Sequence, residues 1–300
     1  MRTKTYLFAL MAMALTLGSC SDNENGIGGE TSKYITVSTS IGNMTRVATD
    51  EKGGQTFEEG DEISVYAWIG APTVAPETSE RVVNNAINKL TNGAWVATPQ
   101  MLWKNNRDKH YFIGVYPISA ISDLSAGEYT FDVNKQTESD LLVAVNADGL
   151  SYNADEQQTV PLTFTHVMSK LAVNLAYKNQ WGGIPTVEKV VVGNAAKEAT
   201  INYLTKVVTP STTAKEDFSL PEITENTKYV SVIIPQEEVK QLTIVIGGKN
   251  FVYDNGTPFK LESGKITTVN LEVGRDEIKL GDVKITDWEN GSTFSGEALN

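Results

Sequence analysis

Short runs rich in Val, Ile, Thr, Tyr and Phe recur along the chain between Gly, Asn, Asp and Pro residues. Each run has the length of a β-strand, and the residues between runs favour turns. Apolar and polar residues alternate over 169–175, which predicts a strand with one buried face. The only helical feature that we expect is one turn over 237–242. The predicted strands lie at 34–41, 62–69, 111–116, 129–133, 141–145, 162–177, 187–192, 199–208, 229–234, 242–246, 251–253 and 266–273.

Two short segments predict tight hairpins. Asn92-Gly93 lies between strand-like flanks that contain Leu90 and Trp95. Both turn residues tolerate a positive φ angle, which a two-residue hairpin of the favoured type requires. Gly247-Gly248 is the second candidate. The pattern as a whole predicts an all-β protein of the sandwich class, without the alternating helices of a parallel sheet.

The length of the chain allows two domains. About 280 of the 300 residues remain after the N-terminal segment described below, enough for two domains of ordinary size. One set of predicted strands lies before residues 164–169 and a second set follows them. We therefore expect an N-terminal domain at 33–166 and a C-terminal domain with a terminal tail at 167–300. No linker rich in Pro or Ser separates them, so we expect the domains to adjoin closely.

The N-terminus has the layout of a secretory signal peptide. Arg2 and Lys4 precede an apolar run at 6–17, which is too short for a membrane-spanning helix. Leu17-Gly18-Ser19-Cys20 follows and resembles the lipobox of bacterial lipoproteins, which implies that Cys20 is acylated (palmitate among its fatty acids) and becomes the new N-terminus. A plain signal peptide with an incidental cysteine is the alternative. Cys20 is the only cysteine, so it cannot form an internal disulfide.

Residues 21–32 have the composition of a tether. A polar, acidic run at 21–25 precedes a Gly-rich segment at 26–32. The run after Cys20 resembles a signal that sends lipoproteins to the outer face of the outer membrane; an ordinary polar tether is the alternative. Two or more acyl chains would hold such a precursor firmly.

The net charge of the chain limits the classes of partner that it is expected to bind. Loss of the signal peptide, with Arg2 and Lys4, takes the formal net charge from −12 to −14. Such acidity argues against binding to nucleic acid and against electrostatic adhesion to anionic lipid. No second apolar run of membrane-spanning length occurs, so we expect the lipid to be the only membrane contact.

Several segments, in order and spacing, resemble the fimbrillin-like family, whose members are pilus subunits assembled by protease-triggered strand exchange. The most specific is Val160-Pro161-Leu162-Thr163-Phe164-Thr165-His166 followed by Ser169-Lys170-Leu171-Ala172-Val173. The others are Phe57-Glu58-Glu59-Gly60-Asp61-Glu62-Ile63-Ser64-Val65, Tyr111-Phe112-Ile113-Gly114-Val115-Tyr116-Pro117, Asp140-Leu141-Leu142-Val143-Ala144, Ile233-Ile234-Pro235-Gln236, Leu261-Glu262-Ser263-Gly264-Lys265-Ile266-Thr267 and Ile285-Thr286-Asp287-Trp288. The resemblance implies two tandem transthyretin-like Greek-key β-sandwich domains and a surface-exposed lipoprotein of the cell outer membrane that enters a pilus after processing.

The same resemblance implies a processing site. An Arg-specific protease cuts the family's pilins after an arginine in the linker that follows the first strand, and Arg46, with Val47 after it, occupies the matching position. The displaced strand would carry Tyr34, Ile35, Val37 and Ile41. Its loss would leave unpaired backbone groups and an uncovered core, which a strand from the next subunit could fill head-to-tail. An ordinary loop arginine is the alternative.

The tail departs from what a donor strand needs. A donor should alternate apolar residues over several positions, but after Trp288 only Phe294 and Ala298 share a parity, and glycines weaken the run. Val283 and Ile285 alternate better, but we expect them in the last strand of the C-terminal domain. A tip or anchor subunit, or a non-polymerising surface adhesin for a glycan or host protein, is therefore the alternative to a stalk subunit.

No enzyme signature for phosphate binding, nucleophilic catalysis or metal binding occurs in the chain, and we expect no catalytic residue, cofactor or metal. We interpret His166 as a hydrogen-bonded structural residue and the carboxylates at 58–62 as a solvated turn. Trp181, in a loop flanked by Gly182 and Gly183, is the best candidate for an exposed ligand contact.

Overall fold

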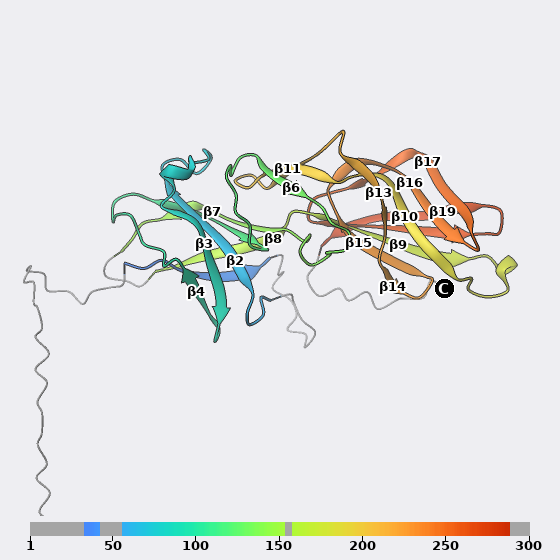
Figure 1. Cartoon of the computed structure of the whole chain (residues 1–300), viewed down its shortest axis with the longest axis horizontal. Coiled ribbons are helices and arrows are strands. Elements are labelled where there is room, and N and C mark those ends of the chain that lie inside the picture. The colour runs from blue at the N-terminus through green and yellow to red at the C-terminus, as the bar shows by residue number, and fades with distance from the viewer. Residues whose placement is uncertain (1–32, 43–55, 154–157, 289–300) are drawn as a thin grey trace, which may run out of the picture. The chain divides into compact units, whose positions relative to one another are not determined.

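The computed structural model describes residues 33–42, 56–153 and 158–288, and their regular structure is almost entirely β (Figure 1). Two short 3-10 helices, η1 (Thr78–Glu80) and η2 (Asn179–Trp181), are the helical elements of these ranges. The predicted all-β class is confirmed. The described residues contain no helix whose length and apolar character would let it span a membrane.

The first eight strands in the chain, apart from β6, build one seven-stranded sheet. Its order is β1 (Thr36–Ile41), β8 (Thr159–His166), β7 (Leu142–Leu150), β5 (His110–Tyr116), β2 (Glu62–Ile69), β3 (Val83–Thr91) and β4 (Ala94–Thr98). Buried and less buried positions alternate in β8, where Val160, Leu162 and Phe164 are buried, whereas in β2 every residue from Ile63 to Trp68 is buried.

Three further sheets contain the remaining strands. The four-stranded sheet is β13 (Lys215–Ser219), β10 (Val187–Ala196), β16 (Gln236–Ile246) and β17 (Lys249–Leu261). The five-stranded sheet is β14 (Glu222–Thr224), β15 (Lys228–Ile233), β9 (Ser169–Tyr177), β18 (Lys265–Val273) and β19 (Ile278–Asp287), and the three-stranded sheet is β12 (Val207–Pro210), β11 (Glu198–Asn202) and β6 (Gly127–Thr130). Because β6 pairs with β11, this last sheet joins strands from both halves of the chain.

The predicted hairpins are confirmed, whereas the predicted helical turn is wrong. Asn92 and Gly93 link β3 to β4 with φ angles of 53° and 75°, and Gly247 and Gly248 link β16 to β17 with 59° and 72°. Residues 237–242 lie within β16, because Val239 and Leu242 pack into a core that the neighbouring strands β10 and β17 enclose. Tertiary burial thus overrides the local signal of Glu and Lys residues.

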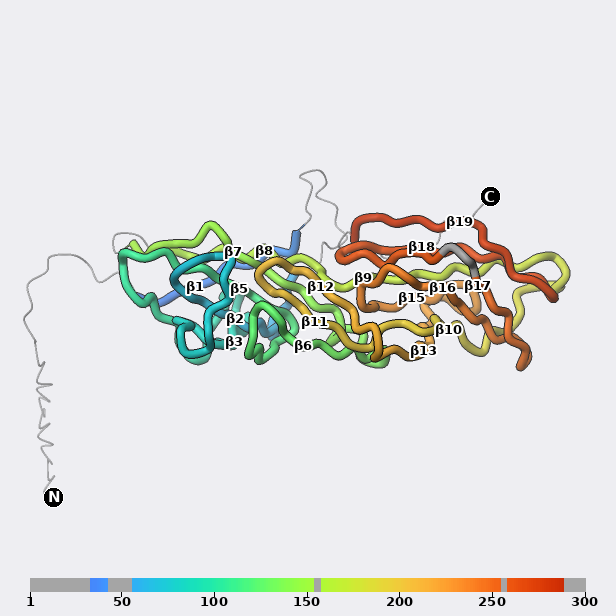
Figure 2. The backbone as a smooth tube through the Cα atoms, turned by 90° about the horizontal axis from the view of Figure 1, so that it is seen from above, coloured from blue at the N-terminus to red at the C-terminus, as the bar shows by residue number. Residues whose placement is uncertain are grey.

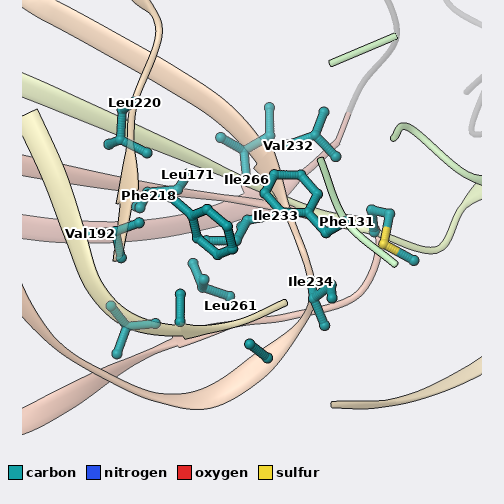
Figure 3. Packing of buried hydrophobic residues seen from close by; sticks show 14 of the residues in the cluster. Phe131, Leu171, Val192, Phe218, Leu220, Val232, Ile233, Ile234, Leu261 and Ile266 are labelled. Atoms are coloured by element: carbon teal, nitrogen blue, oxygen red, sulfur yellow. The ribbon is translucent and has the colours of Figure 1, made fainter. Parts of the chain in front are cut away.

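The seven-stranded sheet is packed on both faces. In β2, Ile63 and Val65 point into one apolar cluster, while Tyr66 and Trp68 point into a second. We call the first cluster the inner core; β1, β2, β5, β7 and β8 all contribute to it. The second cluster extends through the other three sheets. In it, Phe131, just after β6, meets Phe218 of β13 edge to face at 5.0 Å, and Figure 3 shows Phe131 among Ile233, Ile234 and Phe218.

A buried aromatic stack lies where β8 passes into β9. His166 ends β8, and its ring stacks on Trp288 at 4.0 Å with planes only 5° apart. Nδ1 of His166 lies 2.8 Å from Oδ1 of Asp140. Nζ of Lys170 lies 4.3 Å from the centre of the Trp288 ring, and burial lowers the pKa of Lys170. The expected structural role of His166 is confirmed, while the division at 166/167 into two domains stays a prediction.

At Gly114 of β5 the backbone packs tightly against side chains of the inner core. A methyl group here would lie 2.6 Å from Cζ of Phe164 and 3.1 Å from Cδ1 of Leu162. We expect Gly114→Ala to lower the free energy of unfolding by about 1–3 kcal/mol through overpacking, measured by urea unfolding. Gly193→Ala is the control, because its methyl would meet only the side chain of Gln241, with Oε1 at 2.7 Å and Cβ at 3.3 Å, and this exposed side chain can move toward solvent. Equal losses in both variants would contradict this account.

Candidate functional site

β1 is an edge strand held on one side by β8. The two strands pair in parallel from Thr36 opposite Thr159 to Ile41 opposite Phe164. The pairing is extended past the end of β1, where the N–H of Gly42 donates to the carbonyl of Phe164 at 2.9 Å. Figure 2 shows β1 in blue close to β7 and β8. Every residue of β1 is therefore matched to a partner on β8.

The two faces of β1 have different chemistry. Ile35, directly before β1, and Val37 and Ile41 within it are buried in the inner core, together with the apolar residues of β8. The opposite positions carry small hydroxyl side chains, and Oγ of Ser40 donates to Oγ1 of Thr163 at 3.2 Å. This division follows from the period of two in a strand, which places alternate side chains on opposite faces.

The other edge of β1 lies beside β4, the far end of the same sheet. The two ends meet at Tyr34 and Leu102, which form an isolated antiparallel bridge, and the N–H of Ile35 donates to the carbonyl of Met101 at 3.0 Å. Further along, Nε1 of Trp95 donates to Oγ1 of Thr39 at 3.0 Å. The sheet is thus curled, with β1 closing it.

An open groove of about 580 Å³ remains between β1 and β4. Phe57 and Trp95 lie along it, together with the whole of β1. Phe57 contacts Trp95 edge to face at 5.3 Å and Phe164 at 5.1 Å. An aromatic wall therefore already stands beside β1, and it would flank any strand that took the place of β1.

The energetic consequence of removing β1 can be bounded. Burial of Ile35, Val37 and Ile41 contributes about 1.5–3 kcal/mol each, or about 5–9 kcal/mol together. A typical domain is stable by only about 5–15 kcal/mol. Loss of β1 would also leave the N–H and C=O groups along the edge of β8 unpaired. The resulting site would bind an extended peptide with apolar side chains at every second position.

The predicted site residues divide into two groups. Ile35, Val37 and Ile41 lie together in the inner core, and Tyr34, two residues before β1, has an exposed side chain. Cys20, Arg46 and Val47 lie outside the described residues, so lipidation and cleavage at these positions stay predictions. Gly42, the last described residue before the gap at 43–55, ends the segment that pairs with β8.

Trp181 lies in η2 and is partly buried. Its ring packs edge to face against Tyr177 and Phe251, and its Nε1 donates to the carbonyl of Val273 at 3.0 Å. The guanidinium carbon of Arg275 lies 5.7 Å from the ring centre. A ligand could therefore reach only part of the ring, and this contact stays a prediction.

The carboxylates near residue 60 accept backbone hydrogen bonds, one within their own turn and one from the hairpin between β3 and β4. Oδ2 of Asp61 accepts from the N–H of Glu58 at 2.7 Å, and Oε1 of Glu59 accepts from the N–H of Asn92 at 2.7 Å. These bonds tie the entry of β2 to the hairpin between β3 and β4. Within 33–42, 56–153 and 158–288, no group of three or more His, Cys, Asp or Glu residues is placed to hold a metal ion.

Sequence reasoning missed the contacts of β1 with the far end of its sheet. Trp95, expected as a flank of the β3–β4 hairpin, is partly buried against the inner core, and its Nε1 donates to Oγ1 of Thr39. Thr39 lies on the same face of the strand as Ile35, Val37 and Ile41. A polar residue on this otherwise apolar face was the signal in the sequence that could have predicted the contact. An inward hydroxyl needs a partner, and Trp95 provides it.

β19 holds the candidate donor residues of the C-terminal half. It pairs antiparallel with β18 at one edge of the five-stranded sheet. Val283 and Ile285 are 36% and 41% exposed, although Val283 faces the buried Val269 across the ladder. The expectation that these residues belong to the last strand is confirmed, and that strand presents incompletely covered apolar side chains.

Comparison with known proteins gives a consistent result. A family model described as fimbrillin-like matches residues 45–288. No curated protein matches the chain. A candidate cell adhesion protein from Bacteroides uniformis is 18% identical with a TM-score of 0.61, covering 85% of this chain and 98% of its own.

Two further solved structures share the fold. A candidate cell adhesion protein from Bacteroides ovatus is 17% identical with a TM-score of 0.62, covering 85% of this chain and 98% of its own. A fimbrial protein from Bacteroides vulgatus is 12% identical with a TM-score of 0.50, covering 84% of this chain and 99% of its own. At these identities the similarity extends to the fold alone.

The packing of β1 predicts a sharp contrast between its faces. We expect Ile35→Ala to lower the free energy of unfolding by about 2–4 kcal/mol, because it opens a cavity in the inner core. Ser38→Ala, on the exposed face of the same strand, should stay within about 0.5 kcal/mol. Urea unfolding of the two variants measures the difference. If Ile35→Ala were as mild as Ser38→Ala, β1 would not seal the inner core.

Proposed function

The chain belongs to the fimbrillin-like family, and we propose that it is a pilus subunit whose first strand is exchanged for a strand of the next subunit. The protein is a structural component of fimbriae and adhesion, not an enzyme. Its partners are other pilus subunits. The observation that carries the proposal is the position of β1, an edge strand that closes the inner core and ends just before the arginine expected to be cut.

Cleavage between Arg46 and Val47 would leave β1 bound only by non-covalent contacts. Three residues separate Gly42, still paired with β8, from Arg46. After the cut, β1 would be held by its parallel ladder to β8 and by its three buried side chains. An incoming strand could then compete with β1 for the same edge and the same inner core.

Strand direction favours replacement. Parallel pairing is slightly less stable per residue than antiparallel pairing. A donor strand that ran antiparallel to β8 would therefore gain a better ladder while filling the positions of Ile35, Val37 and Ile41. Each subunit would give a strand to one neighbour and accept a strand from another, and such a head-to-tail contact grows into a filament.

Lipidation at Cys20 completes the proposal. The chain would travel as a lipoprotein to the surface of the outer membrane, with palmitate among its acyl groups, and would enter the pilus after processing. Two or more acyl chains give the stable anchoring that a precursor awaiting a protease requires. Labelled palmitate incorporated by the wild-type chain and not by Cys20→Ala would support this step.

The second candidate function is a tip or anchor subunit, or a non-polymerising surface lipoprotein, that binds a glycan or host protein. The observation that favours it is the weak donor end. Val283 and Ile285 of β19 offer two alternating apolar residues, and the tail adds Phe294 and Ala298, whereas β1 fills its site with three. The exposed part of Trp181 is the best candidate for an adhesive contact.

Arg46→Ala tests the processing step. We expect the wild-type protein sheared from cells to begin at Val47 and to run in SDS-resistant ladders. The variant should keep its N-terminal segment and lose the ladder, because β1 stays covalently linked to the chain. N-terminal sequencing and mass measurement distinguish the two. Arg275→Ala, a change at another exposed arginine, is the control and should behave like wild type. A wild-type chain that begins at acylated Cys20 and forms no ladder would favour the anchored adhesin.

A disulfide between β1 and β8 tests the exchange itself. Ser40 and Thr163 are register partners with their hydroxyl oxygens 3.2 Å apart, so Ser40→Cys with Thr163→Cys should bridge them on the exposed face. We expect the oxidised double variant to be cut after Arg46 and yet to remain monomeric, because β1 cannot leave. A reductant should restore the ladder. The Ser40→Cys single variant controls for the substitution, and polymerisation of the oxidised double variant would refute exchange of β1.

A further inference from the structure

Basic side chains gather at the end of the seven-stranded sheet where β1 begins. The loop between β4 and β5 carries Lys104, Arg107 and Lys109, all exposed. Lys33 lies beside this loop, because the N–H of Trp103 donates to the carbonyl of Lys33 at 3.1 Å. Lys33 thus adjoins the loop that carries the other three cations, in a chain whose formal net charge is −12.

Two exposed apolar side chains accompany these cations. Tyr34 and Leu102 are bridge partners and are 52% and 50% exposed. Tyr34 directly follows Lys33 in the sequence, and Leu102 lies two positions before Lys104. We call Lys33, Tyr34, Leu102, Lys104, Arg107 and Lys109 the basic end surface. A cationic rim around exposed aromatic and aliphatic side chains is the chemistry of a surface that meets lipid headgroups.

The cations of the basic end surface are not neutralised by ion pairs among the described residues. The ion pairs of these ranges use other lysines and His166. Nζ of Lys109 donates to the backbone carbonyl of Asp148 at 3.0 Å. The carboxylate of Asp108 accepts from Nδ2 of Asn105 at 2.8 Å. The positive charges therefore remain available to an outside anion.

A buried histidine fixes the loop that presents them. Nε2 of His110 accepts from the N–H of Lys104 at 3.1 Å, so Nδ1 carries the proton and donates to the carbonyl of Asp108 at 3.1 Å. Burial lowers the pKa of His110, which keeps the ring neutral and both bonds in place. Oδ1 of Asn105 accepts from the N–H groups of Arg107 and Asp108. The loop is thus built before any partner arrives.

The position of the surface in the chain indicates what it meets. Twelve residues separate Cys20 from Lys33. Even fully extended, they span at most about 43 Å. A lipid on Cys20 would therefore keep this end of the sheet close to the membrane. Each Lys or Arg residue near an anionic membrane strengthens the electrostatic attraction of the protein to that membrane. This attraction decays within a Debye length.

We propose that, against the expectation from the net charge, the basic end surface docks locally on the anionic phosphate headgroups of the membrane that holds the Cys20 lipid. This inference rests on the proposed lipidation for its biological setting, although the surface itself consists of described residues. Docking would orient the precursor with the start of β1 toward the membrane and would add a second hold to the acyl chains.

Vesicle binding tests the proposal without the lipid. The chain from residue 21 onward retains the compact unit that begins at Thr31. We expect it to co-sediment with phosphatidylcholine vesicles containing about one-third phosphatidylglycerol at least about tenfold better than with pure phosphatidylcholine. Raising the salt from about 0.1 M to about 0.5 M should remove the difference. Combined Lys104→Glu, Arg107→Glu and Lys109→Glu substitutions should remove it too.

A matched variant separates a local surface from overall charge. Lys215→Glu, Lys240→Glu and Lys279→Glu change the net charge equally at exposed positions on β13, β16 and β19. This variant should bind like the parent. Equal binding of the parent to both vesicles, or equal loss in both triple variants, would overturn the proposal. If vesicle binding fails but Cys20 is still labelled by palmitate, the proposed lipidation stands and only the docking surface is refuted. If the protein binds the vesicles but Cys20 is not labelled, the lipidation is refuted and the docking surface stands.

Discussion

The structure depends on the inward-facing side chains of β1. Ile35, Val37 and Ile41 complete the inner core of a sheet whose two ends are otherwise joined by the backbone contacts around the Tyr34–Leu102 bridge and by the Trp95–Thr39 hydrogen bond. A strand in this position has a weaker backbone attachment than an interior strand of the sheet, since one edge has a parallel ladder and the other is largely open. The free energy that its buried side chains contribute is nevertheless comparable with the free energy of unfolding of a whole domain. Because its backbone is weakly attached, β1 can be replaced by another strand. Because its side chains contribute so much to the core, the protein needs a replacement strand once β1 is gone.

The remaining edges show how the fold limits unwanted pairing. The side chain of Gln136 covers part of the edge of β15, where its Oε1 accepts from the N–H of Val232 at 2.7 Å and its Nε2 donates to Oγ of Ser231 at 3.0 Å. β19 instead carries charged residues, among them Lys279 and Lys284, along its exposed length. Both devices discourage edge-to-edge association. A protein that polymerises through one strand site has reason to protect its other edges.

Much of the fold was predictable because its signals are local. The alternation of β8 and β9, the Asn92-Gly93 hairpin and the apolar phase of β1 each depend on residues that are neighbours in sequence. The contacts that complete the site are not local. Trp95 reaches Thr39 across 56 positions, and Trp288 stacks on His166 from the far end of the described chain. The helical turn expected over 237–242 failed for the same reason, since long-range burial of Val239 and Leu242 decides the conformation there.

The proposed surface and the proposed cut act on opposite ends of one strand. The segment that contains β1 begins at the basic end surface, with Lys33 and Tyr34, and runs to Gly42, just before Arg46. A cut after Arg46 would break the covalent link between the lipid and the rest of the protein, yet β1 would still hold the two together through its ladder and its buried side chains. The protein would then leave the lipid only when another strand displaced β1, and with β1 it would lose Lys33 and Tyr34 from the basic end surface. Release from the membrane and entry into the filament would therefore be one event, and uncovered inner core would never face solvent.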